Sequence, residues 1–159
     1  MASITVERSI GKTKKAVLDG LIGYNNERMG KQKYKRLAIS LKERGKIVGG
    51  IVGEVWTSVL FIQFFWIEQK FRGRDHGTKL IAAIEDEARR IGATRSYLDT
   101  MSFQAPGFYR SRGYKEFGAI DGYPEGVTRH WFTKALCPHP TPNSAPEARK
   151  RRPSRSRGR

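Results

Sequence analysis

The sequence is poor in features that would each define a class of protein. It has a single cysteine, Cys137, which excludes an internal disulfide framework and a zinc site built from several cysteines. Its longest strongly apolar run, residues 59–67, is interrupted by Gln63 and is far shorter than the roughly 20 residues of a membrane-spanning helix. Residues 1–8 carry charge too early for a signal peptide. We therefore expect a cytoplasmic protein without a membrane segment.

Acidic residues are scarce relative to basic ones. The chain has 31 Lys and Arg against 15 Asp and Glu, a formal net charge of +16, which favours polyanionic or phosphorylated partners. Residues 137–159 hold seven basic residues, one acid and no aromatic or branched aliphatic side chain. We expect this segment to be a disordered tail. Two interpretations stay open: a solvated tail without a dedicated role, or an arm that makes weak contact with nucleic acid together with the basic surface. Residues 1–136 are expected to form one domain.

Hydrophobic periodicity over residues 1–136 predicts alternating strands and helices. The most apolar segment, residues 60–71, predicts a central strand buried on both faces. It leads directly into an amphipathic helix over residues 77–91, which Gly92 ends. The other predicted strands are residues 3–10, 35–41, 46–56, 97–103, 114–119 and 129–134, and the other predicted helices are residues 14–29 and 107–112.

The junction between the central strand and its helix combines glycine with positive charge, in the order Arg72-Gly-Arg-Asp-His-Gly77. Backbone N–H groups at a helix N-terminus are unpaired and carry partial positive charge, so a diphosphate bound there gains hydrogen bonds and a favourable field. Gly73 and Gly77 allow the backbone to approach closely, and Arg72 and Arg74 attract anions. The alternative interpretation is a basic, solvated turn.

Two motifs in this region resemble the GNAT superfamily of acyl-CoA-dependent N-acetyltransferases. The segment 72–77, preceded by Trp66-Ile-Glu68, is similar to the family's Gln/Arg-x-x-Gly-x-Gly/Ala signature. The segment 103–114, with Phe108-Tyr109 at its centre, is similar to its A-x-x-F-Y-x-x-x-G-F/Y segment. Asp75 replaces the signature's first glycine. An aspartate can adopt the left-handed backbone that glycine serves there, although its carboxylate competes for the helix N–H groups.

The resemblance implies an α/β fold with a mixed, mostly antiparallel sheet flanked by helices and splayed between its fourth and fifth strands. It implies acetyl-CoA as the co-substrate and no metal. The pantetheine arm would pair with the backbone in the splay, and the diphosphate would bind the helix N-terminus. The residues implied to hold the cofactor are Phe65, Ile67, Arg72, Gly73, Arg74, Asp75, His76, Gly77 and Thr78.

The resemblance also implies a catalytic role for Tyr109, as the general acid that protonates the leaving thiolate. The backbone N–H of Ile67 is the expected donor to the oxyanion. For the general base, the sequence offers Glu54, Glu68 and Asp99 on strands near the splay, and a chain of water molecules is equally available. Neither His130 nor Ser102 has the partners of a metal site or a catalytic triad.

The expected acceptor is a primary amine of a small molecule, which attacks the thioester directly in a ternary complex. Two alternatives stay open: an amine carried by RNA or protein, and a non-enzymatic module that binds acyl-CoA or nucleic acid on the same fold. The dense aromatic run 61–66 is expected to be mostly core, while Trp56, Phe64 or Phe103 could line an acceptor pocket. A homodimer is compatible with the sequence.

Overall fold

The structure is a computed structural model that describes residues 2–136, so the tail predicted at 137–159 lies outside the described residues. No helix of the described part is long and apolar enough to cross a membrane. Short 3-10 turns lie at Gln69–Phe71 and Pro124–Gly126. The main elements, in chain order, are α1 (Ile10–Met29), β1 (Tyr34–Glu43), β2 (Lys46–Trp56), β3 (Val59–Ile67), α2 (His76–Arg90), β4 (Arg95–Met101), α3 (Pro106–Ser111), β5 (Lys115–Ile120) and β6 (Arg129–Ala135).

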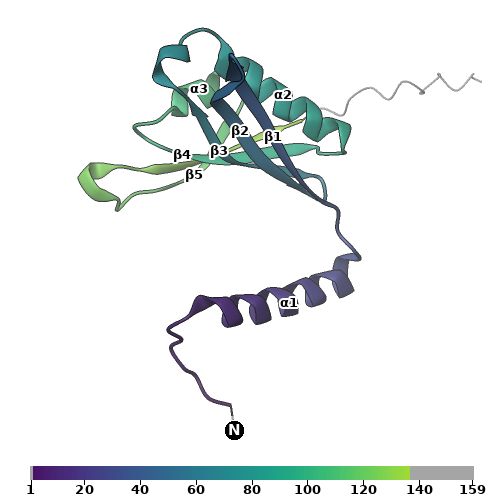
Figure 1. The fold of residues 1–159 in the computed structure, drawn as a ribbon. Helices are drawn as coiled ribbons and strands as arrows, with labels where there is room; N and C mark the ends of the chain where they lie inside the picture. Colours follow the sequence, from purple (N-terminus) through teal and green to yellow (C-terminus); the bar gives the residue numbers. More distant parts are fainter. Residues whose placement is uncertain (1, 137–159) are drawn as a thin grey trace, which may run out of the picture.

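The strands form one six-stranded sheet in the order β1-β2-β3-β4-β6-β5 (Figure 1). Every neighbouring pair is antiparallel except β3 and β4, which run parallel because α2 connects them as a crossover. The mixed, mostly antiparallel sheet predicted from the sequence is therefore confirmed.

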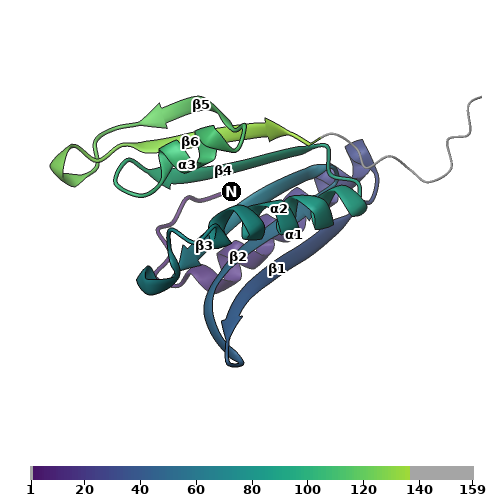
Figure 2. The ribbon, with the colours of Figure 1, turned by 90° about the horizontal axis from the view of Figure 1, so that it is seen from above.

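The parallel pair β3 and β4 is joined over only part of its length. Val59–Ile62 of β3 pairs with Arg95–Leu98 of β4, and the two strands then diverge, as Figure 2 shows from above. These strands are the fourth and fifth of the series predicted from the sequence, so the predicted splay is present. Its consequence is that residues 63–67 of β3 face no strand on the β4 side within the described residues.

Helix α2 covers one face of the sheet. Its apolar residues recur at helical spacing, and Leu80, Ile81, Ile84 and Ala88 are all buried against the strands. Gly92 follows the helix with a positive φ of 98°, the left-handed geometry expected where a glycine ends a helix. The short helix α3 packs on the same side, beside the N-terminal end of α2 (Figure 2).

Within residues 2–136, nothing covers the opposite face of the sheet, which corrects two expectations. The central strand is not buried on both faces, because Phe64 and Trp66 are 71% and 56% exposed. The aromatic run is therefore not mostly core: Phe65 packs against the core, while Phe61 is half-buried and stacks on Tyr97 at 4.6 Å between ring centroids. Successive side chains of a strand point to opposite faces, and α2 and α3 cover only one of them.

The N-terminal segment departs most from the sequence prediction. The strand expected at residues 3–10 is absent: residues 2–9 are irregular, and α1 begins at Ile10. A strand needs a neighbour for its backbone N–H and C=O groups, and this segment lies away from the sheet (Figure 1). The predicted helix at 14–29 does form, but none of its residues is buried in its own chain.

Candidate active site

The N-terminus of α2 has the backbone geometry needed to bind an anion. Asp75 adopts φ 62° and ψ 5°, the left-handed conformation for which the resemblance places a glycine. Its side chain makes no capping hydrogen bond to the helix. The N–H groups of the first turn, at His76, Gly77 and Thr78, are therefore not occupied by this carboxylate.

The two glycines of the loop serve different purposes. Gly73 has φ 71°, a conformation that an L side chain rarely adopts, so glycine is needed there for the turn. Gly77 lies inside α2, where an added Cβ would come within 3.3 Å of the Phe108 ring. Gly77 thus lets α3 pack tightly against the first turn of α2, a structural reason for glycine that does not depend on any ligand.

The loop side chains are fixed by few contacts. Arg72 Nε donates to the carbonyl oxygen of Ile67 at 2.7 Å, which ties the loop to the end of β3. Arg74 is exposed, and His76 is half-buried. The hydroxyl of Thr78 accepts a hydrogen bond from Arg112 at 2.5 Å.

A cavity of about 290 Å³ occupies the splay. Its walls are residues 62–66 of β3 and 98–101 of β4, and Gln104 and Tyr109 complete it. Gln104 holds the end of β4 in place, because its side-chain oxygen accepts from the backbone N–H of Met101 at 2.9 Å and from the Thr100 hydroxyl at 3.0 Å. The predicted cofactor residue Phe65 lines this cavity, and Ile67 follows at the end of the same strand.

Tyr109 comes to the cavity from α3 and is only 7% exposed. Its ring packs against Tyr114 and Phe132, with centroid distances of 6.0 and 6.1 Å. Burial, and to a smaller extent the negative charge of Asp99, raise the pKa of Tyr109 to about 12. The phenol therefore keeps its proton at neutral pH.

The three acidic candidates for the base lie in different surroundings. Asp99 lines the cavity, where Arg129 Nε donates to its carboxylate at 2.7 Å. Glu54 lies on β2 opposite Phe61, and its carboxylate accepts from the hydroxyl of Tyr34. Glu68 follows the end of β3, with a carboxylate oxygen 3.3 Å from Lys70 Nζ. The structure therefore brings Asp99 together with Tyr109, but it places neither Glu54 nor Glu68 in the cavity wall.

Sequence reasoning missed three residues that shape this site: Gln104, Arg112 and Arg129. Gln104 was visible as a polar residue just after the predicted strand 97–103. Arg112 and Arg129 had no signal, since their partners Thr78 and Asp99 are distant in sequence and only the folded chain brings them together. Within residues 2–136 no group of three or more His, Cys, Asp or Glu side chains is arranged to hold a metal ion.

Comparisons with known proteins agree with this geometry. Residues 14–114 match the model of the acetyltransferase (GNAT) family. The chain is 41% identical to blasticidin-S acetyltransferase of Streptomyces morookaense over 95 residues, which are 59% of this chain and 70% of the relative. It is 30% identical to an acetyltransferase of Agrobacterium fabrum over 124 residues, 77% of this chain and 90% of the relative.

A solved structure is similar over nearly the whole fold. The crystal structure of an acetyltransferase from Bacillus cereus superposes with a TM-score of 0.77 at 31% identity, covering 84% of this chain and 98% of the other. Its match extends the likeness from two motifs to most of the chain. With the splay, the helix N-terminus and the family match in agreement, the chain belongs to the GNAT family of acetyltransferases.

Proposed function

We propose that the protein is an N-acetyltransferase that moves the acetyl group of acetyl-CoA to a primary amine of a small molecule, by direct attack in a ternary complex. The observation that carries this proposal is the alignment of three features along one edge of β3: the cavity in the splay, the uncapped N-terminus of α2, and the buried, protonated Tyr109. A cytoplasmic location stays a prediction of the sequence.

The chain's own residues fit a coenzyme A molecule in two places. The first-turn amides of α2, with Arg72 and Arg74 beside them, would hold the diphosphate, because Asp75 does not cap those amides. Backbone groups of Phe65 and Ile67, on the β3 edge left without a strand partner, would pair with the pantetheine amides. When bound, acetyl-CoA supplies the acetyl thioester.

Tyr109 is the proposed general acid. It reaches the splay from α3, and its raised pKa of about 12 ensures that the hydroxyl still has a proton to donate to a departing sulfur at any physiological pH. The Ile67 N–H is the proposed donor to the oxyanion of the tetrahedral intermediate. Both groups are held by packing and strand geometry rather than by exposed loops.

Asp99 is the acidic group best placed to act on the acceptor. Asp99 lines the same cavity as Tyr109, and an ammonium entering the cavity would be attracted to its negative charge. An alkyl ammonium with a pKa of about 10.4 must lose a proton before it can attack. Since Glu54 and Glu68 lie outside the cavity wall, a chain of water molecules or Asp99 is the favoured route for that proton.

The substrate class is proposed from the relatives. One of them is named for the acetylation of blasticidin S, so this antibiotic is the first acceptor to test, followed by other amine antibiotics, polyamines and free amino acids. The assay is release of free coenzyme A thiol. A peptide and an aminoacyl-tRNA belong in the same panel, because the net charge of +16 also favours anionic acceptors.

Two measurements test the proposal. Acetyl-CoA is expected to raise the melting temperature by an amount that grows with its concentration. Tyr109→Phe should lower kcat by roughly 100-fold or more with little change in acetyl-CoA affinity. The control is Tyr97→Phe, a tyrosine stacked on Phe61 outside the cavity wall. No melting shift at millimolar acetyl-CoA, or equal turnover of the Tyr109 variant, would contradict it.

A further inference from the structure

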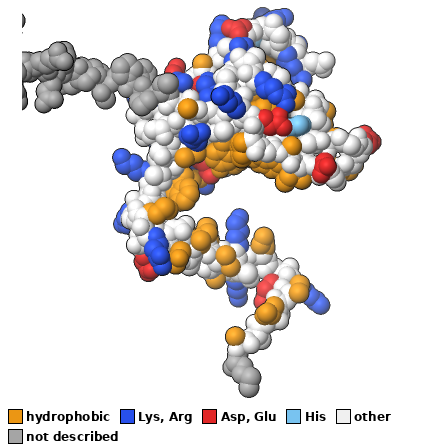
Figure 3. Space-filling view, turned by 180° about the vertical axis from the view of Figure 1, so that it is seen from behind, with side chains coloured by type: hydrophobic (Ala, Val, Ile, Leu, Met, Phe, Trp, Pro, Cys, Tyr) orange, Lys and Arg blue, Asp and Glu red, His pale blue; other side chains and the backbone are white. Residues whose placement is uncertain are grey.

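Two apolar surfaces of the described chain have no partner. The first is the face of the sheet opposite α2, here called the open face. Figure 3 shows its hydrophobic side chains as a patch on the side of the sheet turned toward α1. Its large apolar side chains are 38–71% exposed, and they are Tyr34, Val52, Trp56, Phe64, Trp66, Phe117 and Ile120.

The second surface is the N-terminal arm, residues 2–29, which consists of an extended segment and α1. Helix α1 has 20 residues and buries none of them. At 100° per residue, its large apolar side chains fall on one half of the helix circumference. They are 48–78% exposed, and they are Ile10, Val17, Leu18, Leu21, Ile22, Tyr24 and Met29. Lys14, Asn25 and Arg28 lie in the same half and interrupt the apolar surface. Most of the stability of such a helix comes from packing against a partner.

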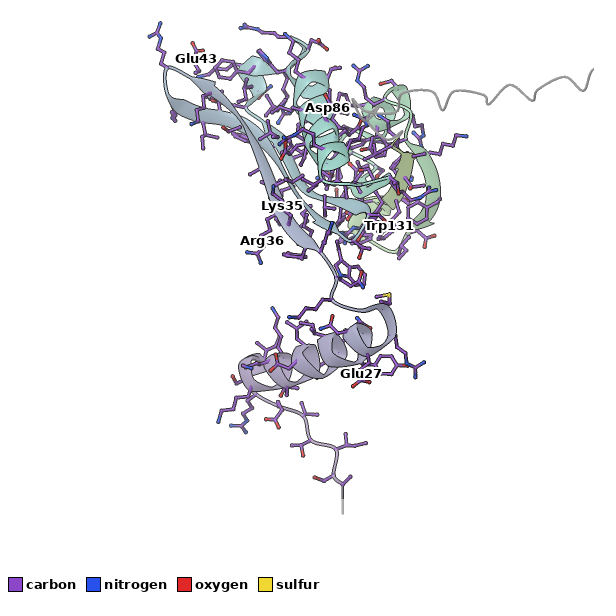
Figure 4. All side chains as sticks on the ribbon, turned by 90° about the vertical axis from the view of Figure 1, so that its right-hand side faces the viewer. Glu27, Lys35, Arg36, Glu43, Asp86 and Trp131 are labelled. Atoms are coloured by element: carbon purple, nitrogen blue, oxygen red, sulfur yellow. The ribbon has the colours of Figure 1, made fainter. Side chains whose placement is uncertain are left out.

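The link between the arm and the sheet is bonded to Thr57, and α1 lies away from the open face of its own chain (Figure 1). The backbone N–H of Thr57 donates to the Lys33 carbonyl at 2.8 Å, and the Thr57 hydroxyl donates to Gln32 Oε1 at 2.7 Å. The Gln32 amide in turn donates to the Gly30 carbonyl at 2.8 Å. These bonds join the segment that follows α1 to the turn between β2 and β3. Figure 4 shows the outcome: Trp131 lies on the side of the sheet nearer α1, and Glu27 lies on a helix that does not reach it.

The two surfaces match in extent. When a half-exposed, large apolar side chain becomes buried, roughly 50–100 Å² of its surface is removed from water. Seven such side chains on α1 and seven on the open face would bury on the order of 1,000 Å² at one contact, and a symmetric pair of contacts about twice that. Stable dimers bury about 1,200–2,000 Å² or more, so the exchanged area is sufficient.

We propose that α1 of one copy packs on the open face of a second copy, with the reciprocal contact related by a two-fold axis, to form a homodimer by exchange of arms. Each copy supplies a helix that the described part of its own chain leaves unpacked, and it receives one on a sheet face that its own described helices leave exposed. The inference rests on packing and stands whether or not the protein transfers acetyl groups.

The tryptophans report on this surface directly. The chain has three, and all of them lie on the open face: Trp56 and Trp66 are 47% and 56% exposed, and Trp131 on β6 is half-buried. We therefore expect the full-length protein to have twice the chain mass by light scattering and a blue-shifted tryptophan emission. On dilution, the emission should shift to the red together with the loss of dimer mass.

Substitutions in the arm test the contact without touching the folded body. Leu21→Glu places a charge in the apolar half of α1, and it should raise the dimer dissociation constant by at least about tenfold because both contacts lose a leucine. Lys12→Gln changes the net charge by the same amount on the opposite side of α1 and should leave the constant within about twofold. Val52→Glu makes the corresponding change on the open face.

Mixing the two disruptive variants separates exchange from other arrangements. A dimer of one Leu21→Glu chain and one Val52→Glu chain retains one intact contact, so the mixture should form more dimer than either variant alone. A monomer with blue-shifted emission at every dilution would mean that each arm covers its own sheet. A red-shifted monomer would mean that nothing covers the open face, and a dimer insensitive to Leu21→Glu would place the interface elsewhere. Each of these results overturns the proposal.

Discussion

The two faces of the sheet are made from alternate residues of the same strands, yet they differ completely in packing. On the α2 side, Ile51, Leu60 and Phe132 are fully buried. On the other side, neighbours in the same strands, such as Val52 and Phe64, are 38% and 71% exposed. The difference shows that burial in this chain is decided by which helices are available, and not by the apolar content of the strands.

The largest expected effect comes from replacing one phenylalanine on each face of the sheet by alanine. Phe132→Ala should lower the free energy of unfolding by about 3–5 kcal/mol, because it leaves a cavity in the core. Phe64→Ala, measured on the dissociated chain, should lower it by less than about 1 kcal/mol, because that ring is 71% exposed. Urea unfolding of both variants in the Leu21→Glu background gives the comparison. Equal losses would mean that the open face is packed within a single chain.

Ion pairs give a second comparison of the two faces of the sheet, because breaking a pair should cost more on the covered face. Glu85 is 3% exposed on the α2 side, and its carboxylate accepts from Lys134 at 2.7 Å and from the Tyr114 hydroxyl at 3.0 Å. Glu85→Gln should cost about 3 kcal/mol, because it leaves the Lys134 ammonium partly buried without a counter-charge.

The matched variant on the open face is Asp99→Asn, which breaks the pair with Arg129. That pair is more exposed, with 20% and 36% of its two side chains accessible, so the cost should be about 0.5–1 kcal/mol. Chemical denaturation at low and high salt measures the loss of unfolding free energy in both variants. If Asp99→Asn lost as much unfolding free energy as Glu85→Gln, the ion pair on the open face would be as shielded from water as the pair in the core.

Alkaline pH tests the burial of tyrosine on the covered face. The folded pKa of Tyr109, about 12, lies above the ordinary tyrosine pKa of 10.0, so its stabilising contribution is complete below pH 10 and is lost as the pH rises toward 12. The loss should approach about 2–3 kcal/mol. Burial and Glu85 also raise the pKa of Tyr114, which adds in the same direction. Tyr109→Phe should flatten the decline of stability in this range, and a curve parallel to the wild type would exclude this tyrosine as its source.

The smallest expected effect is the difference in stability between alanine substitutions at two helical glycines. Gly107→Ala in α3 meets nothing within 4 Å and should be neutral or slightly stabilising, as alanine favours the helix. Gly77→Ala places a methyl group 3.3 Å from the Phe108 ring and should be less stable than Gly107→Ala by about 1 kcal/mol. Thermal unfolding of the two variants measures this. Equal effects would mean that α2 and α3 are loosely packed.

Much of the fold could be predicted from local pattern. The strand predicted at 46–56 coincides with β2, and the helix predicted at 77–91 differs from α2 by one residue at each end. Alternation in the first case and a helical apolar face ended by Gly92 in the second are local signals that tertiary contacts did not override. The left-handed Asp75 was likewise anticipated, because aspartate tolerates that backbone better than most residues.

The errors occurred where the outcome depends on a neighbour. Residues 3–10 have the alternation of a strand, but a strand forms only beside another strand, and none is available to this segment within the described chain. Residues 60–71 were expected to be buried on both faces because of their apolar density, and β3 ends instead at Ile67 with one face open. In the site, Asp99 and Arg129 are paired through neighbouring strands that sequence spacing does not reveal.

The short parallel contact of β3 and β4 has a mechanical consequence. Four residue pairs and the packing of α2 join a three-stranded unit, β1-β2-β3, to another, β4-β6-β5. A long, narrow ligand can therefore enter the gap between the two units without a lid that must open and close. The backbone amides that point into this gap should exchange with solvent deuterium readily in the free protein and slowly once a ligand lies along them.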